Sequence, residues 1–146
     1  MKIALGSDHA GFDLKESIKG YLDRSGYSFT DFGINSPGSA DYPEYAYKVA
    51  QAIVSGSYDR GILLCGTDIG VCITANKVKG IRAALAYNVS SARLSRAHND
   101  ANVLCLCGRE FSPEQAREIV EIWLKTSFEG GRHQKRVDMI SNLTGL

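Results

Sequence analysis

Asp59–Lys79 (DRGILLCGTDIGVCITANKVK) is the stretch of sequence that decides how the chain is organised. The apolar run Ile62–Leu64 has the character of a buried parallel strand, and it ends at Cys65. Gly66–Gly70 follows as a glycine-rich segment, and Val71–Lys77 then has a helical pattern. The stretch predicts a strand, a tight loop and a helix, and in an open α/β sheet such a loop lies where ligands bind.

Cys65 is the residue of chemical interest in this stretch. Loop glycines let backbone N–H groups approach a ligand closely, and the N-terminus of the following helix adds partial positive charge that suits an anion. The same charge can lower the pKa of a thiol from ~8.5 toward neutral pH, so that a thiolate could act as nucleophile or base. From position alone, a small buried side chain that closes the strand is an equally good interpretation.

The order of residues in the loop excludes three common phosphate-binding motifs. The loop does not read G-x-x-x-x-G-K-[ST], so it is not a P-loop, and it lacks the G-x-G-x-x-G dinucleotide fingerprint. A phosphatase-type loop needs an Arg after five residues, whereas Val71 stands at that distance from Cys65.

Composition indicates one globular domain spanning residues 1–146, with 44% hydrophobic and 23% charged residues. The net charge of +1 gives no support for a nucleic-acid or membrane partner, and no apolar run reaches the ~18 residues of a membrane span. The N-terminus runs directly into a strand without a signal-peptide pattern, and the four cysteines form no C-x-x-C pair. We therefore expect a cytoplasmic protein with reduced core thiols.

Short apolar strands alternate with helical segments along the whole chain, which predicts an α/β fold with a parallel sheet covered by helices on both faces. The predicted strands are residues 2–6, 27–32, 62–65, 81–86 and 102–107. The predicted helices are residues 12–25, 43–55, 71–77, 88–97, 112–126 and 132–143.

Several chemically active residues lie near the predicted strand ends. Asp8 and His9 follow the first strand, Cys65 ends the third, and Arg109 follows the fifth. His98 and Asn99 end the helix before the fifth strand, and Arg132 and Arg136 share a face of the last helix because they are four residues apart. Each has an ordinary structural interpretation, such as a helix cap or a solvated face. Together they suit proton transfer on a small phosphorylated substrate.

Six segments in a fixed order give the chain a family resemblance. They are Gly6–Gly11, Asp41–Pro43, Cys65–Lys77, Gly80–Ala83, Ser95–Asn102 and Glu129–Arg136. On these segments the sequence resembles the ribose-5-phosphate isomerase B family, which also includes galactose-6-phosphate isomerase subunits and allose-6-phosphate isomerases.

The resemblance implies a Rossmann-like, three-layer α/β/α fold and an aldose–ketose isomerase that uses no metal or other cofactor. It also implies a homodimer or homotetramer with its active sites at the subunit interface. The implied catalytic residues are Cys65 as the base, His98 for opening the sugar ring, and Thr67. The implied substrate-binding residues are Asp8, His9, Gly66, Thr67, Asp68, Ile69, Gly70 and Asn99. The implied phosphate ligands are His9, Arg109, Arg132 and Arg136, some of them donated by the neighbouring subunit.

Ribose 5-phosphate is the expected substrate, because Cys65, His9 and His98 all occur in this one chain. Isomerisation of a hexose 6-phosphate, such as allose or galactose 6-phosphate, is the alternative within the family. A sugar-phosphate-binding protein without activity is the alternative outside it.

Asp68 stands where members of the family usually have glycine. A positive φ at this position would be tolerated by Asp better than by most residues. The Asp68 carboxylate could cap the next helix, oppose an enediolate or raise the pKa of Cys65. We expect Asp68 to alter sugar preference or to lower turnover.

Overall fold

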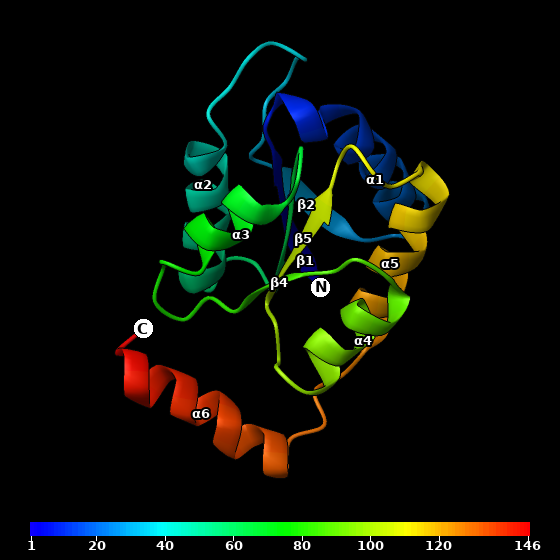
Figure 1. Ribbon diagram of the computed structural model, residues 1–146. Coiled ribbons are helices and arrows are strands. Elements are labelled where there is room, and N and C mark those ends of the chain that lie inside the picture. Colours follow the sequence, from blue (N-terminus) through cyan, green and yellow to red (C-terminus); the bar gives the residue numbers. More distant parts are fainter.

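The computed structural model describes all residues from 1 to 146, and strands alternate with helices along the chain as predicted (Figure 1). The strands are β1 (Lys2–Ser7), β2 (Ser28–Asp31), β3 (Arg60–Cys65), β4 (Ala83–Leu85) and β5 (Val103–Cys107). The helices are α1 (Phe12–Arg24), α2 (Tyr42–Val54), α3 (Ile69–Ala75), α4 (Val89–Ala97), α5 (Pro113–Lys125) and α6 (Arg132–Thr144), with a 3-10 turn at His9–Gly11. The largest difference in length is β4, which is shorter than the expected strand 81–86 and pairs on one side only, at the edge of the sheet. Helix α3 begins and ends two residues before the expected helix 71–77, so Ile69 and Gly70 belong to the helix.

All five strands are parallel and lie in the order β2-β1-β3-β5-β4. This arrangement confirms the predicted α/β fold with a five-stranded parallel sheet. The carboxyl end of β3 lies beside that of β5, since Cys65 pairs with Cys107, and Ser7 of β1 pairs with Leu64. The three central strands therefore bring their following loops to one edge of the sheet.

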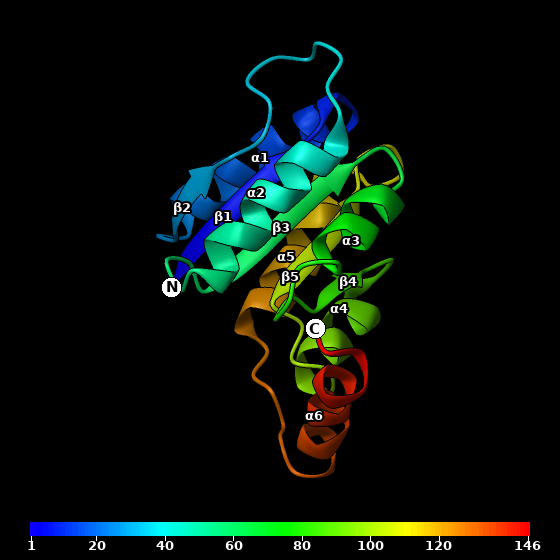
Figure 2. The same ribbon diagram turned by 90° about the vertical axis from the view of Figure 1, so that its left-hand side faces the viewer.

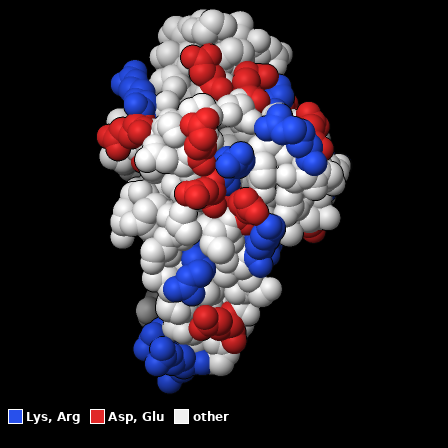
Figure 3. Space-filling view, turned by 90° about the vertical axis from the view of Figure 1, so that its right-hand side faces the viewer, with Lys and Arg blue, Asp and Glu red and all other residues white.

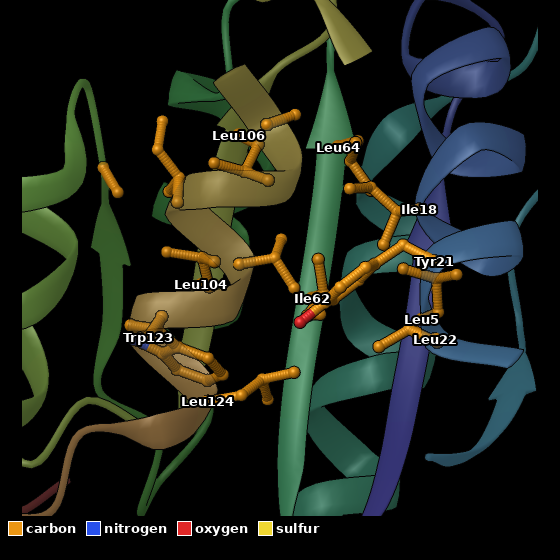
Figure 4. Packing of buried hydrophobic residues seen from close by; sticks show 14 of the residues in the cluster. Leu5, Ile18, Tyr21, Leu22, Ile62, Leu64, Leu104, Leu106, Trp123 and Leu124 are labelled. Carbon is orange, nitrogen blue, oxygen red and sulfur yellow. The ribbon is translucent and has the colours of Figure 1, made fainter. Parts of the chain in front are cut away.

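Two hydrophobic layers hold the sheet between helices (Figures 1 and 2). On one face, Ile62 and Leu64 pack with residues of α1, α4 and α5, and Figure 4 shows Trp123 and Leu124 of α5 reaching the central strands. On the other face, Leu63 and Cys65 pack with residues of α2 and α3. Because strand side chains alternate between faces, this register directs Cys65 toward the α2 and α3 layer.

The helix starts follow the capping signals in the sequence. Ser112 accepts a hydrogen bond from the Gln115 backbone N–H at 3.2 Å, while Gln115 Oε1 accepts one from the Ser112 N–H at 2.9 Å. Asn88 caps α4 in the same reciprocal way with Ser91. These capping boxes satisfy N–H groups that the first helical turn leaves without partners.

Helix α6 extends away from the sheet and its covering helices (Figures 1 and 2). Only His133 and Val137 of this helix are buried, whereas Met139 and Leu143 are 46% and 79% exposed. None of the helices combines the length and apolar character that crossing a membrane requires. Acidic and basic side chains are interspersed on the face drawn in Figure 3, in line with the net charge of +1.

Candidate active site

A small pocket of about 190 Å³ lies at the carboxyl ends of β1, β3 and β5. It is lined by Asp8, His9, Ala10, Tyr42, Cys65, Gly66, Thr67, Gly70 and Arg109. Except for Ala10 and Tyr42, these are residues that the sequence predicts for the site. The open edge of a parallel sheet has thus collected a thiol, a carboxylate, an imidazole and a guanidinium around one space.

Asp8 and His9 are fixed by backbone contacts at the start of the 3-10 turn. Asp8 is 6% exposed, and its Oδ1 accepts hydrogen bonds from the N–H groups of Ala10 at 2.9 Å and Gly11 at 3.0 Å. His9 Nδ1 accepts a hydrogen bond from the Ala40 N–H at 3.3 Å. In a neutral imidazole that accepts at Nδ1, the proton is on Nε2, so His9 keeps one donor for a ligand.

Cys65 is 4% exposed, and it is held by its carbonyl oxygen, which accepts a hydrogen bond from the Gly108 N–H at 2.7 Å. Burial raises the pKa of the Cys65 thiol, and the charge of Asp8 acts in the same direction. Backbone N–H groups of Val71, Thr67 and Asp68 lower this pKa but do not overcome burial. Of the two directions that the sequence left open for this pKa, the chain therefore has the raised one, although the thiol does have N–H donors that favour a thiolate.

Asp68 adopts the left-handed conformation that the family's usual glycine suggested, with φ of 58°. Its side chain does not cap α3, which removes one of the three roles that the sequence left open for this carboxylate. Burial, and then the charge of Glu110, raise the pKa of Asp68 to about 6. Asp68 precedes α3 and Ile69 is its first residue, but neither lines the pocket, and Ile69 is 53% exposed.

Gly66 in the loop and Gly70 in α3 permit close approach between elements. A Cβ at Gly70 would lie 2.6 Å from ring atoms of Tyr42, and one at Gly66 would lie 3.1 Å from Arg109 Cζ. Tyr42 therefore reaches the pocket across Gly70, from the first residue of α2. The Asp41-Tyr42-Pro43 segment was noted in the sequence as a helix start and as part of the family resemblance, but without a role in the site, so Tyr42 was missed as a site residue.

The remaining predicted site residues lie at the opposite end of the strands, on the side of the amino-terminal end of β5. His98 and Asn99 precede β5, whose far end carries Cys107 beside Cys65. At about 3.3 Å per residue, the strand alone separates its two ends by roughly 13 Å. Arg132 and Arg136 begin α6 near this second group and are exposed. Within one chain, the structure does not bring these residues to the Cys65 pocket.

A pair of arginines holds the backbone beside His98 and Asn99. Asp100 has φ of 46°, which is costly for a residue with a side chain. Its Oδ1 accepts from Arg96 Nη1 at 2.8 Å and its Oδ2 from Arg82 Nη2 at 2.9 Å. Arg82 Nε also donates to the carbonyl oxygens of Asn99 at 3.1 Å and Asp100 at 3.0 Å. These contacts pre-organise the turn that presents His98 and Asn99.

His98 stacks on His133, with ring centroids 4.2 Å apart and planes 8° from parallel. Glu129 Oε2 lies 3.7 Å from His98 Nε2 and 3.8 Å from His133 Nε2. An imidazole binds a metal in the plane of its ring, and two nearly parallel planes do not meet at one ion. The cluster is therefore better described as a stacked pair with a nearby carboxylate than as a metal site, and sequence reasoning missed His133.

Comparison with known proteins assigns the family. A family model described as Ribose/Galactose Isomerase matches residues 3–140. Ribose-5-phosphate isomerase B of Escherichia coli is 49% identical over 140 residues, which cover 96% of this chain and 94% of that protein. D-erythrulose-4-phosphate isomerase of Pectobacterium atrosepticum is 46% identical, with 96% and 93% covered.

Solved structures agree with the sequence matches. Ribose-5-phosphate isomerase B of Clostridium thermocellum is 50% identical with a TM-score of 0.98, covering 99% of this chain and 98% of that one. The enzyme of Mycoplasma genitalium, solved with bound ribulose-5-phosphate, is 43% identical with a TM-score of 0.94, covering 99% and 96%. The family resemblance carried by the six sequence segments is confirmed, and this chain belongs to the Ribose/Galactose Isomerase family.

Proposed function

We propose that the protein interconverts ribose 5-phosphate and ribulose 5-phosphate. The observation that carries the proposal is the position of Cys65, a buried thiol that lines a pocket with His9 and Arg109 and has backbone N–H donors around it. A relative with bound ribulose-5-phosphate supports the choice of substrate. No cofactor is needed for this reaction, since a proton moves between neighbouring carbons without net oxidation.

Cys65 is the proposed base. As a thiolate it takes the C2 proton of the open aldose, which leaves an enediolate with its negative charge on the C1 oxygen. The thiol then returns the proton to C1, while the C2 hydroxyl loses its proton and the C1 oxygen gains one, which gives the C2 ketone and the C1 hydroxyl of the ketose. The N–H groups of Thr67, Asp68 and Val71 face the thiol region and would stabilise negative charge that develops there.

A second copy of the chain is proposed to complete the site with His98, Asn99, Arg132 and Arg136. On α6, Arg132, Arg136, Met139 and Leu143 recur at helical spacing and share one exposed stripe. Two arginines followed by two exposed apolar residues suit an interface in which the apolar part packs and the cations reach the partner's pocket. This assembly explains why the expected phosphate ligands lie apart within one chain.

His98 of the second copy would open the furanose ring, which must precede proton transfer at C2. Arg109 and His9 of the first copy, with Arg132 and Arg136 of the second, would hold the phosphate. Arginine suits this task because its planar guanidinium donates two parallel hydrogen bonds to phosphate oxygens. The four unpaired thiols fit a reducing compartment, so we also expect the enzyme to act in the cytoplasm.

A second substrate has a specific observation in its favour. The Pectobacterium relative, named for D-erythrulose 4-phosphate, is nearly as similar to this chain as the Escherichia coli enzyme. A four-carbon sugar phosphate therefore belongs in any substrate panel, beside the hexose 6-phosphates. Asp68, with its charge close to the catalytic loop, is the residue that we expect to influence the choice.

The test is turnover of ribose 5-phosphate by the wild type, Cys65→Ala and Cys72→Ala. Cys72 is the matched control, because it is also buried on the same face of the sheet but does not line the pocket. We expect loss of at least about 100-fold in kcat for Cys65→Ala alone. Turnover that survives this change would remove Cys65 as the base. A ligand-dependent rise in Tm without any isomerisation would instead indicate a binding protein.

A further inference from the structure

The histidine stack of His98 and His133 is a feature that the proposed mechanism leaves unused. His98 has 36% of its side chain exposed, whereas His133 has 8% exposed. The rings lie face to face at 4.2 Å, close to van der Waals contact. His98 therefore presents one face and its edge to solvent, while its other face is covered.

The segment around Glu129 brings the two rings together. The Glu129 N–H donates to the Ala97 carbonyl oxygen at 3.0 Å, which ties the segment to the C-terminal end of α4 beside His98. Gly130 and Gly131 then turn the chain with φ of 65° and 54°, and the His133 N–H donates to the Gly130 carbonyl oxygen at 3.0 Å. Only glycine adopts such consecutive positive φ values readily, so this turn places His133 directly over His98.

The surroundings of the stack lower the pKa of His133. Burial lowers the pKa of His133, and the neighbouring His98, Arg132 and Arg136 act in the same direction, while Glu129 opposes them. A lowered pKa favours the neutral imidazole of His133, which stacks on His98 without adding a positive charge to the pair. Glu129 lies near both Nε2 atoms, at distances longer than a direct hydrogen bond, where it offsets positive charge without locking either ring.

We propose that His133 is a positioning residue for His98: its ring covers one face of the His98 imidazole and fixes the plane in which His98 exchanges a proton with the sugar ring. The inference rests on the proposed role of His98 in ring opening. General acid–base catalysis requires the donor atom within hydrogen-bond reach of the oxygen, so a ring that rotates freely about its side-chain bonds loses efficiency. The stack removes this freedom before substrate binds.

The test compares His133→Phe with His133→Leu in the intact protein. Both replacements are apolar and large, but only Phe is flat and preserves the stack. We expect kcat for ribose 5-phosphate to fall about tenfold in His133→Leu, with KM changed less than about twofold, and to be restored largely in His133→Phe. Equal kcat values for the two variants, with an active wild type, would overturn the inference while leaving the proposed function in place. A wild type without turnover of any sugar phosphate would overturn the proposed function itself.

A measurement on the wild type removes the dependence on variant folding. The protein has only three histidines, so their ring protons can be assigned by NMR with His9 as an internal reference. We expect a nuclear Overhauser effect between the His98 and His133 rings. Absence of this contact would overturn the inference whatever the kinetics show.

Discussion

If the active site is shared between two copies of the chain, two inactive variants must repair each other when their subunits mix. Cys65→Ala removes the proposed base from the pocket, and His98→Ala removes the proposed ring-opening group at the opposite sheet edge. A mixed dimer then has one site with both defects and one site with none. Each homodimer has two defective sites.

The expected recovery follows from the symmetry of the assembly. Random exchange of equal amounts gives about half mixed dimers, each with one intact site out of two, so activity should reach about a quarter of the wild-type value. Each parent alone should retain about 1% or less, since a positioned base or acid contributes at least 100-fold. The difference is large enough for a coupled spectrophotometric assay of ribulose 5-phosphate formation.

The matched control mixes two variants from the same half of the site. Cys65 and Arg109 line the same pocket of the same chain. Mixing Cys65→Ala with Arg109→Ala therefore leaves no intact site in any dimer. In a mixed dimer each site then carries one of the two defects, and no recovery is expected. Subunit exchange is verified by native mass spectrometry. If subunit exchange between Cys65→Ala and His98→Ala is complete but the activity of the mixture does not exceed the residual activities of the two variants, the shared site is refuted.

Three further predictions concern single residues. Asp68→Asn should raise Tm more at pH 7.5 than at pH 4, because a carboxyl whose pKa is raised to about 6 binds protons more tightly in the folded state and costs stability as pH rises through that range. Equal gains in Tm at both pH values would contradict this. Unchanged kinetic constants for Asp68→Gly across a sugar-phosphate panel would remove Asp68 as a specificity residue. Lys15→Met should lower the free energy of unfolding by about 3 kcal/mol and Tm by roughly 10 °C, because Lys15 is fully buried and donates to Asp31 at 2.7 Å and to the Ile34 carbonyl oxygen at 2.6 Å. Burial alone would raise the pKa of Asp31, but hydrogen bonds from Lys15, Gly33 and Lys19 lower it. The stability that this carboxylate contributes is therefore present above pH ~3.8 and lost below it, as acid titration of both proteins would reveal. The rate of Cys65 alkylation by iodoacetamide should keep rising with pH above the pKa of an ordinary thiol, because burial raises the pKa of Cys65. An alkylation rate that levels off near pH 7 would contradict the structure.

The sequence was sufficient for the fold because its local signals agree with one another. Apolar runs of strand length alternate with amphipathic segments, and Ser112 with Pro113 and Gln115 marks a helix start that the structure reproduces. The shortened β4 is the exception, and its cause is not local. An edge strand has one neighbour, so the pairing of Ala83–Leu85 with β5 decides its length, and that pairing depends on strand order.

For the site, sequence reasoning identified residue types better than their places. Asp8, Cys65 and Arg109 follow strands whose carboxyl ends must meet, so their convergence was predictable. His98 and Asn99 come before β5, and their chain position already indicates the amino-terminal edge. The pKa of Cys65 could not be predicted, because the helix N-terminus is visible in sequence whereas the degree of burial depends on packing from α2 and α3.

Helix α6 connects association with catalysis in the proposed assembly. Its arginines and its exposed apolar residues occupy one stripe, so any contact that buries Met139 and Leu143 also fixes where Arg132 and Arg136 point. The ion pairs of Asp100 hold His98 and Asn99 in place through contacts within the chain. Each chain therefore prepares two rigid half-sites before association, and subunit docking needs only to bring them together, which keeps the entropic cost of forming the complete site low.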